Sequence, residues 1–493
     1  MLHSSIWGLE FRSILTAVTL GAAACGGAIF VVSACGGSSD TTAAAPAEGG
    51  PTGFDFDATP ESSVECTGLA CRIAECVDDP AGTRILGTVT DPAGARPIFN
   101  AVVYVPNAPL APLTAGASCE RCDAPHSGAP LVMTTTDATG HFELDNVPFG
   151  DNIPVVVQIG KWRRTTVLAN VGSCQETMMD LRLPKNRAEG DIPKIAITTG
   201  AADPLPCLLR KIGIDDSEIG IAGSDARIHL YQGGGYDDGD GGTTMTASGA
   251  FVAGQTFPKA ESLWTDPAAL AKYDAVLLAC EGAPDDDATH KSPAAKQALY
   301  DYAKAGGRVL ATHFHDNFFS ESPDPAPRGV AAWSDRTGPA AGDPRTTSVD
   351  TDVAVAFPKA AAMSTWLSKQ GALTAGGKLT LFDARHDVDG VDAGALAWIQ
   401  VANPGFPAAP AVQHLTFVAP IGATGAQACG RVAFTNVHFG PSSEASLTDD
   451  ATKPFPASCQ TKELTAQQKA LEFLLFDLTS CVQDDAAKLV TPQ

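Results

Sequence analysis

From residue 192 onward, apolar runs rich in branched residues alternate with helix-like segments, and this alternation constrains the fold more than any other feature. The expected strands lie at 194–200, 227–231, 273–280, 308–313, 378–383 and 431–437. Between the third and fourth strands, Ser292 and Pro293 begin a helix that Gly306 and Gly307 end. Strands joined by such crossovers pair in parallel. The sequence therefore predicts an α/β domain with a mostly parallel sheet.

A last helix is predicted after residue 464. Thr465 and Gln468 have the spacing of a capping box, in which each residue satisfies a backbone N–H of the other. One face of this helix is apolar, with Leu471, Leu474, Leu475 and Leu478 expected to point inward.

Polar residues gather where these strands end. They are Cys280 and Glu281, then His313, His315, Asp316 and Asn317, then Asp383, Arg385, His386 and Asp387, and finally His438. In an open parallel sheet, ligands bind beyond the carboxyl ends of the strands. These side chains are therefore the candidate site of the α/β domain.

The chemistry of these residues suggests separate roles. The candidates for acid–base catalysis are His313, His438, Glu281 and Asp383, and those for ligand binding are His315, Asp316, Arg385 and His386. Two histidines in an H-x-H pair could also hold a divalent metal ion, with His313, His315 and His438 as candidate ligands. The alternative is that each histidine only hydrogen-bonds a loop.

Three stretches of this region resemble the trehalose-utilisation (ThuA-like) family, namely 273–274 leading into a strand, 306–313 and 430–438. That family has the class I glutamine amidotransferase-like fold, which is flavodoxin-like, and the resemblance implies this fold for 191–482. The strand-end histidines of the family correspond to His313 and His438. Its members are sugar-linked without a settled reaction, so a carbohydrate-like or other small polar ligand is expected.

The amidotransferase relatives need a nucleophilic cysteine in a tight elbow. Here the elbow position, 311–315, reads A-T-H-F-H and contains no cysteine or serine. Cys280 ends the neighbouring strand without such an elbow, and a partner such as Cys207 could hold it in a disulfide. Glutamine hydrolysis is therefore not expected. The remaining interpretations are a hydrolase-type enzyme, or a non-catalytic envelope scaffold or recognition protein with a degenerate fold.

Residues 84–190 are predicted to form an all-β sandwich. Short strands are expected at 84–90, 100–105 and 155–160, and two more within 134–144 on either side of a turn, with another turn at 91–94. The pattern G-x-V-x-D-x-x-G, A-x-V and T-x-x-x-G-x-F-x-L-x-x-V-P-x-G resembles the carboxypeptidase regulatory-like family. It is carried by Gly87, Val89, Asp91, Gly94, Ala101, Val103, Thr136, Gly140, Phe142, Leu144, Val147, Pro148 and Gly150. The resemblance implies a transthyretin-like, non-catalytic accessory domain.

Two features inside and after this sandwich have open interpretations. The basic and aromatic patch at 161–164 could touch a sugar, could touch the second domain, or could be a solvated strand end. The Gly- and Asp-rich loop at 233–242 could bind Ca²⁺, but it lacks the spacing and the terminal Glu of a known calcium loop, and a disordered tip is the other interpretation.

The N-terminus predicts export. No charged residue lies between Arg12 and Asp40, and small residues precede Cys35, as in a bacterial lipobox. We expect a lipoprotein signal at 1–35, lipidation of Cys35 with Cys25 as the alternative, and a flexible tether at 36–62. An uncleaved membrane anchor is the other interpretation. Either way the chain is expected outside the cytoplasm, held on the membrane, with the outer membrane or cell surface favoured.

Cysteine usage agrees with export. Of the 13 cysteines, 11 follow the signal, and outside the cytoplasm they are expected to form disulfides with at least one thiol left over. We expect pairing among the cysteines of 66–122, which include a Cys-rich lead-in at 63–83, and pairing of Cys459 with Cys481 or Cys429. Half of a zinc site at 119–122 is the alternative.

The net charge of −23 excludes nucleic acid as a partner, because no basic cluster offsets it. The last segment, 483–493, is expected to be a tail.

Overall fold

A computed structural model describes residues 66–77, 79–237, 244–283, 290–334, 348–392, 394–401, 411–440 and 449–490. Residues from Glu65 to the C-terminus form one compact unit. The predicted signal, the predicted lipidation site Cys35 with its alternative Cys25, and the predicted tether lie outside the described residues, as does most of the Asp-rich part of the 233–242 loop. Among the helices described, none combines the length and apolar character needed to cross a membrane.

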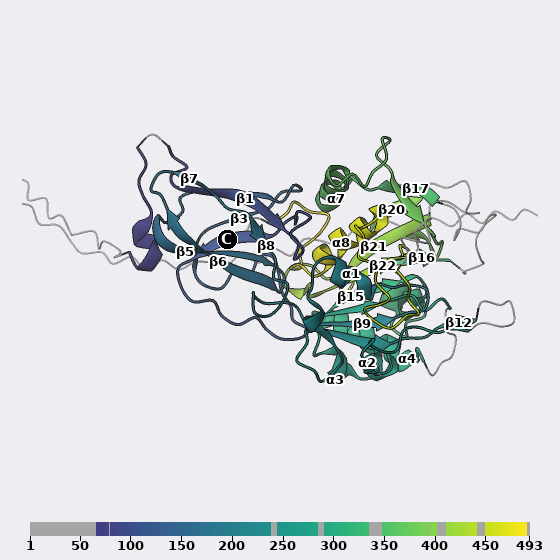
Figure 1. The fold of residues 1–493 in the computed structure, drawn as a ribbon. Coiled ribbons are helices and arrows are strands. Elements are labelled where there is room, and N and C mark those ends of the chain that lie inside the picture. The colour runs from purple at the N-terminus through teal and green to yellow at the C-terminus, as the bar shows by residue number, and fades with distance from the viewer. Residues whose placement is uncertain are drawn as a thin grey trace, which may run out of the picture. The chain divides into compact units, whose positions relative to one another are not determined.

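The N-terminal part is a pair of β-sheets (Figure 1). One sheet contains β1 (Arg84–Thr90), β4 (His141–Leu144), β7 (Glu176–Met178) and β8 (Leu181–Arg182). The other has the order β3-β2-β5-β6, formed by β3 (Pro130–Thr135), β2 (Val102–Pro106), β5 (Gly150–Ile159) and β6 (Trp162–Val171). Phe142 and Leu144 are both buried between these sheets, as their alternation predicts.

The C-terminal part is built on a ten-stranded mixed sheet with the order β10-β11-β9-β14-β15-β22-β21-β20-β17-β18. Its parallel half contains β10 (Ile219–Gly220), β11 (Ile228–Gln232), β9 (Ile195–Thr199), β14 (Ala275–Leu278), β15 (Arg308–Thr312) and β22 (Gly430–Thr435). Its antiparallel half contains β21 (Ala411–Ala419), β20 (Ala395–Val401), β17 (Ser348–Val353) and β18 (Leu379–Phe382). The expectation of a mostly parallel sheet therefore holds for only one half.

Helices cover both faces of this sheet. One face packs against α1 (Pro206–Lys211), α7 (Pro358–Lys369) and α8 (Ala466–Leu478). The other packs against α2 (Glu261–Trp264), α3 (Pro267–Leu270), α4 (Pro293–Lys304) and α5 (Asn317–Ser320). Side chains of β9 alternate between the two faces, because Ile195 and Ile197 belong to the first core and Ala196 to the second. The predicted unit of β14, α4 and β15 is confirmed, with Ser292 as the N-cap of α4.

Short elements complete the fold. They are η1 (Gly68–Arg72), η2 (Asp216–Glu218), β12 (Tyr236–Asp237), β13 (Thr244–Met245), η3 (His313–Asp316), α6 (Pro325–Arg328), β16 (Ala331–Trp333), β19 (Val388–Val391) and η4 (Gly425–Gln427).

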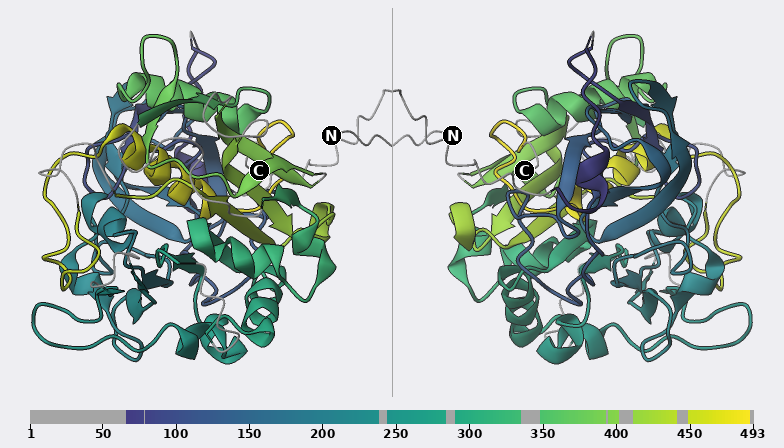
Figure 2. Two further views of the ribbon diagram at one scale, coloured as in Figure 1. Left: turned by 90° about the vertical axis from the view of Figure 1, so that its right-hand side faces the viewer. Right: turned by 90° about the vertical axis from the view of Figure 1, so that its left-hand side faces the viewer.

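Helix α8 lies between the sandwich and the large sheet, and it is the yellow helix in both views of Figure 2. Its capping box is present, as predicted. On the sandwich side, Phe473 stacks on Phe99 and Phe476 meets Trp162 edge to face. The 161–164 patch therefore touches the second domain, because Trp162 also donates to Thr479 and Lys161 pairs with Asp274 at 2.6 Å. Of its three open interpretations, contact with the second domain fits the structure.

The described residues form five disulfides, namely Cys66–Cys71, Cys76–Cys174, Cys119–Cys429, Cys122–Cys481 and Cys207–Cys459. Of the pairing expected among the cysteines of 66–122, Cys66–Cys71 is confirmed. The rest is wrong, because Cys76 bonds to Cys174, and Cys119 and Cys122 both reach the C-terminal part. The expected pairing of Cys459 with Cys481 or Cys429 is also wrong. The leftover thiol is Cys280, which is buried and free of a disulfide, so Cys207 does not hold it.

Candidate functional site

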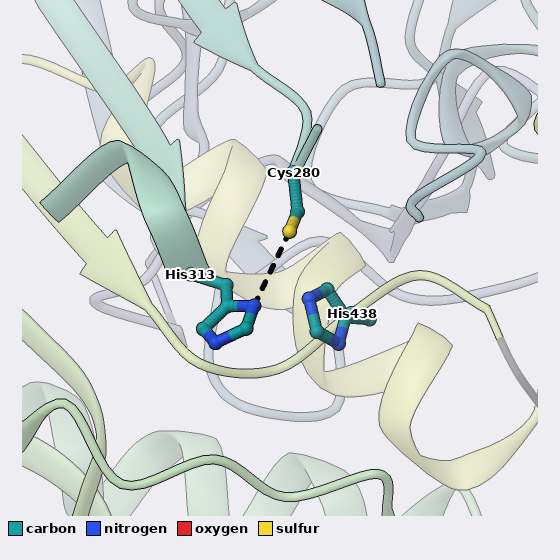
Figure 3. A group of neighbouring side chains, drawn as sticks. All are labelled: Cys280, His313 and His438. Atoms are coloured by element: carbon teal, nitrogen blue, oxygen red, sulfur yellow. Dashed lines mark hydrogen bonds between the residues drawn. The ribbon is translucent and has the colours of Figure 1, made fainter. Parts of the chain in front are cut away.

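Three adjacent parallel strands deliver three metal-binding side chains to one place. Cys280 follows β14, His313 follows β15 and His438 follows β22. Figure 3 shows the three side chains pointing toward one another. The Cys280 Sγ lies 3.2 Å from Nδ1 of His313, and one donor atom from each residue falls within 4.8 Å of the other two. All three are buried. This group is called the thiol–imidazole cluster below.

The backbone is unusual at two residues of the site. His313 has a φ of 41° and Asp383, which follows β18, has a φ of 62°. Residues other than glycine rarely adopt this left-handed region of backbone angles. At His313 the chain turns sharply from β15 into η3, so the imidazole is directed toward Cys280 instead of continuing the pleat of the strand.

A carboxylate lies behind each imidazole. Nε2 of His313 is 3.5 Å from Oδ2 of Asp387, and Nδ1 of His438 is 3.2 Å from Oδ2 of Asp383. Asp383 also pairs with Arg385 at 2.6 Å. A carboxylate on the far nitrogen fixes the tautomer and the orientation of an imidazole. Both rings are therefore held with one nitrogen toward a carboxylate and the opposite edge toward the thiol.

Charges within the site shift its titration. Burial opposes protonation of His438, but the nearby Cys280 and the Asp383 carboxylate outweigh it and raise the pKa of His438 to about 10. Burial would raise the pKa of Asp383, but hydrogen bonding to His438 and the charge of Arg385 hold it below its ordinary value. His438 and Asp383 thus form a buried ion pair when the site holds no other cation.

Glu281 follows Cys280 but belongs to a different network. Its carboxylate is 2.7 Å from Nζ of Lys291 and 3.1 Å from Nε2 of His290, and it accepts the backbone N–H of Gly234 at 2.7 Å. Burial would raise the pKa of Glu281, but the charges of Lys291 and His290 keep it well below its ordinary value. The carboxylate anchors the glycine-rich loop after β11.

The other predicted residues lie around this centre in different roles. His315 is buried beside Trp264 and Phe318, and its Nε2 bonds to the carbonyl of Ala279 at 2.9 Å. Burial and the charge of Lys291 lower the pKa of His315 to about 3, so this ring stays neutral. The structure therefore does not bring the metal candidate His315 into the cluster.

Asp316 ends η3 and is buried. His386 faces Asp389 at 2.6 Å, and its carbonyl accepts the Ser334 hydroxyl. Of the ten residues that follow the strands besides Cys280, the structure gathers His313, His438, Asp383 and Asp387 at the thiol, with Arg385 adjoining them.

Cys280 has no predicted role in the sequence analysis, because it lacks an elbow motif and the expected compartment favours disulfides. Two signals could have retained it. It follows a central parallel strand beside the His313 strand, and an odd number of cysteines follows the signal. Asp387 was recognised at the strand end without a role.

This arrangement supports two kinds of chemistry. A thiolate with two imidazoles is a donor set for Zn²⁺ and related ions. A thiol, an imidazole and a carboxylate in sequence, as in Cys280, His438 and Asp383, can also form an activated nucleophile, in which the protonated imidazole and its carboxylate partner stabilise the thiolate.

Comparison with known proteins adds little to this geometry. No family model and no curated protein matches the sequence. Among solved structures, a ThuA-like protein from Bacteroides uniformis ATCC 8492 is a weak neighbour, with 9% identity, a TM-score of 0.27, and coverage of 45% of this chain and 77% of the other. A type II cohesin–X-dockerin complex from Acetivibrio cellulolyticus aligns over 30% of this chain and 88% of the other, with 13% identity and a TM-score of 0.17.

Proposed function

We propose that this protein is an exported, membrane-anchored lipoprotein whose α/β part carries a metal-dependent, hydrolase-type site for a small polar or carbohydrate-like ligand. The observation that carries the proposal is the thiol–imidazole cluster, with donor atoms of Cys280, His313 and His438 within 4.8 Å of one another.

The surroundings of the cluster favour a metal over three independent polar residues. Metal-binding histidines usually donate their second ring nitrogen to a carboxylate, and here both imidazoles face one, Asp387 for His313 and Asp383 for His438. A single thiol nucleophile needs only one such histidine. Three protein ligands leave a fourth position of a tetrahedral ion for water or substrate, which is typical of catalytic zinc.

A bound divalent cation would supply Lewis-acid chemistry and an activated water. The protein would orient both rings through Asp383 and Asp387 and exclude bulk water by burial. The carbohydrate-like ligand is supported by the resemblance of 306–313 and 430–438 to a sugar-linked family.

Metal analysis of the purified protein tests the centre. We expect about one equivalent of zinc or another transition metal in the wild type, and loss of nearly all of it in Cys280→Ser and His313→Ala, because each removes a ligand. His141→Ala, which changes an exposed histidine of β4, is the matched control and should keep its metal. A metal-free wild type, or full metal content in Cys280→Ser, would contradict the proposal.

A second candidate function is favoured by the order of Cys280, His438 and Asp383, which would make Cys280 the nucleophile of a metal-independent hydrolase. The two candidates differ in their inhibitors. In a screen with model esters and glycosides, a chelator should abolish the activity of a metal enzyme, and added Zn²⁺ should restore it. Activity that resists chelators but is lost on alkylation of Cys280 identifies the nucleophile. If the screen finds no activity on which either treatment could act, the remaining interpretation is a non-catalytic scaffold.

Export and anchoring rest on the N-terminal sequence and agree with the five disulfides. Metabolic labelling with a fatty acid tests the anchor. We expect incorporation of the label into the wild type and none into Cys35→Ala. If Cys35→Ala is still labelled and Cys25→Ala is not, the lipidated residue is Cys25. In this proposal the β-sandwich serves as an accessory domain.

A further inference from the structure

Asp203 connects the segments that carry two residues of the thiol–imidazole cluster. It lies in the loop between β9 and α1, and its side chain is fully buried. Its Oδ2 accepts the Thr312 hydroxyl at 3.2 Å, and its Oδ1 accepts the backbone N–H of Phe439 at 2.9 Å. Thr312 immediately precedes His313, and Phe439 immediately follows His438. One carboxylate therefore holds both histidine segments.

Gln467 connects His438 with its carboxylate partner in the same way. It lies in the first turn of α8 and is buried. Its amide Nε2 donates to the carbonyl of His438 at 2.8 Å, and its Oε1 accepts the backbone N–H of Phe382 at 2.8 Å. Phe382 immediately precedes Asp383. The distance between His438 and Asp383 is therefore set partly by one side chain that bonds to the backbone beside both.

We propose that Asp203 and Gln467 are positioning residues, which hold the backbones of His313, His438 and Asp383 so that the cluster has the geometry of a metal centre. The inference rests on the proposed metal site and goes beyond its ligands. The hydrogen bonds described above join Asp203 and Gln467 to Thr312 and to backbone beside the site residues, so each acts through the segment to which it bonds.

Positioning residues are needed because a metal site tolerates only small displacements of its side chains. Catalytic and metal centres work only when their side chains are held to about 0.5 Å, which requires support from surrounding hydrogen bonds. Here the support comes from buried groups, where a hydrogen bond faces little competition from water. Loss of an outer-shell partner typically lowers metal affinity about 10- to 100-fold.

Titration of the metal-free protein with Co²⁺ measures this directly, because a cobalt–thiolate bond gives a charge-transfer band that reports the bond of Cys280. We expect Asp203→Ala and Gln467→Met to weaken Co²⁺ binding about 10- to 100-fold and to change the band. Asp203→Asn should stay within about threefold of the wild type. Its remaining oxygen still accepts from Phe439, and the Thr312 hydroxyl can turn to the carbonyl of Leu278 at 3.2 Å.

Two variants control for loss of stability. Asp274→Asn alters another buried carboxylate, which pairs with Lys161 at the opposite end of the parallel strands. Lys469→Met removes a bond from α8 to the carbonyl of Gln370. Both should keep the affinity and the band of the wild type. Unchanged affinity in Asp203→Ala and Gln467→Met would overturn the inference, and so would equal losses in the controls. Asp203→Asn as weak as Asp203→Ala would show an effect of charge and also overturn it.

Failure of the proposed function gives a different result. If the wild type shows no cobalt band, the metal centre is wrong, and the positioning roles are then read from the alkylation rate of Cys280, measured on its peptide by mass spectrometry. Asp203→Ala and Gln467→Met should change this rate at least tenfold and the controls should not. A rate that is the same in all variants would overturn the positioning roles.

Discussion

His313 and Asp383 have left-handed backbones on two sides of one cluster, with φ values of 41° and 62°. For residues with a Cβ this region costs about 1–2 kcal/mol. Such strain persists where the surrounding structure enforces it, and it concentrates at functional sites. At His313 the strained residue is the one at which the chain leaves β15 for η3, and its imidazole contacts the Cys280 thiol.

Substitution of His313 by Gly and by Ala separates this strain from the loss of the ring. Both variants should lose the metal, but His313→Gly should be more stable than His313→Ala by about 1 kcal/mol, because glycine has no Cβ to oppose a positive φ. Urea denaturation of the metal-free proteins measures the difference. At His141, in the extended strand β4, the order should reverse. Greater stability of His313→Ala would show that the backbone is not strained.

Another histidine affects stability instead of the site. His414 is buried on β21, and burial together with the charge of Arg431 lowers its pKa to about 3. The folded protein therefore keeps this ring neutral, whereas the unfolded chain protonates it near pH 6.5. Its contribution to stability is complete above pH 6.5 and is lost as the pH falls toward 3.

Replacement of His414 by Leu should flatten the acid side of the stability profile. Between pH 6 and 4 the free energy of unfolding of the wild type should fall more steeply than that of His414→Leu, by up to about 1.4 kcal/mol per pH unit. Urea midpoints at several pH values give both slopes. His141→Leu, at an exposed position, should keep the slope of the wild type. Parallel profiles for the wild type and His414→Leu would contradict the assignment.

At the scale of single elements, apolar periodicity predicts the parallel half of the sheet well. Strands β9, β14 and β15 lie within their predicted ranges and β22 begins one residue before its range, because strands buried on both faces are continuous apolar runs. Strand β21 has no such run. Its buried Gln413, His414 and Thr416 interrupt the apolar pattern, so this central strand was not predicted. The prediction for α8 was a helix with one buried face. In the structure α8 lies between two sheets and is buried on nearly all sides.

The candidate site was predictable to the extent that it follows from parallel pairing. His313 and His438 meet because β15 and β22 are neighbours. The side chains of Cys280 and Glu281 lie in different networks because successive residues that follow a strand point to opposite sides. Glu281 therefore pairs with Lys291 and not with the cluster. The freedom of Cys280 depends on which cysteines meet in space, and no local pattern contains that information.

Gly430 tests how firmly β22 is held where it begins. A Cβ at this residue would lie 1.7 Å from the carbonyl oxygen of Ala303, at the end of α4, and backbone cannot move aside as a side chain can. Gly430→Ala should therefore shift β22, lower the free energy of unfolding by about 1–3 kcal/mol, and weaken metal binding at His438. Gly390→Ala, in strand β19 with open space around its Cβ position, is the matched control. Equal effects of the two changes would show that β22 tolerates the shift.

At the scale of the whole molecule, the sandwich and the α/β part share one hydrophobic core. The residues that join them are buried and charged as well as apolar, since Arg96 of the sandwich pairs with Glu472 of α8 and with Asp91. An accessory domain on a flexible linker would not bury such groups. We therefore expect the described unit to unfold in one cooperative transition.

The two disulfides that cross between these parts close almost the same loop, since Cys119–Cys429 spans 310 residues and Cys122–Cys481 spans 359. With either one intact, the other closes a much shorter loop, made of 119–122 and 429–481. In the chain-entropy description a disulfide stabilises by restricting the unfolded chain, and the longer loop contributes more. The second disulfide to be removed therefore releases the long loop, whichever one it is.

Removal of either crossing disulfide by paired Cys→Ser changes should cost about 2–4 kcal/mol, and removal of both should cost more than the sum of the two single losses. Urea denaturation of the three variants under oxidising conditions measures the coupling. Removal of Cys76–Cys174, which lies within the N-terminal part, should add independently to either single loss. Strict additivity of the two crossing disulfides would mean that the unfolded chain does not behave as one long loop. Two separate transitions after removal of both would show that the disulfides, and not the shared core around α8, make the two parts unfold together.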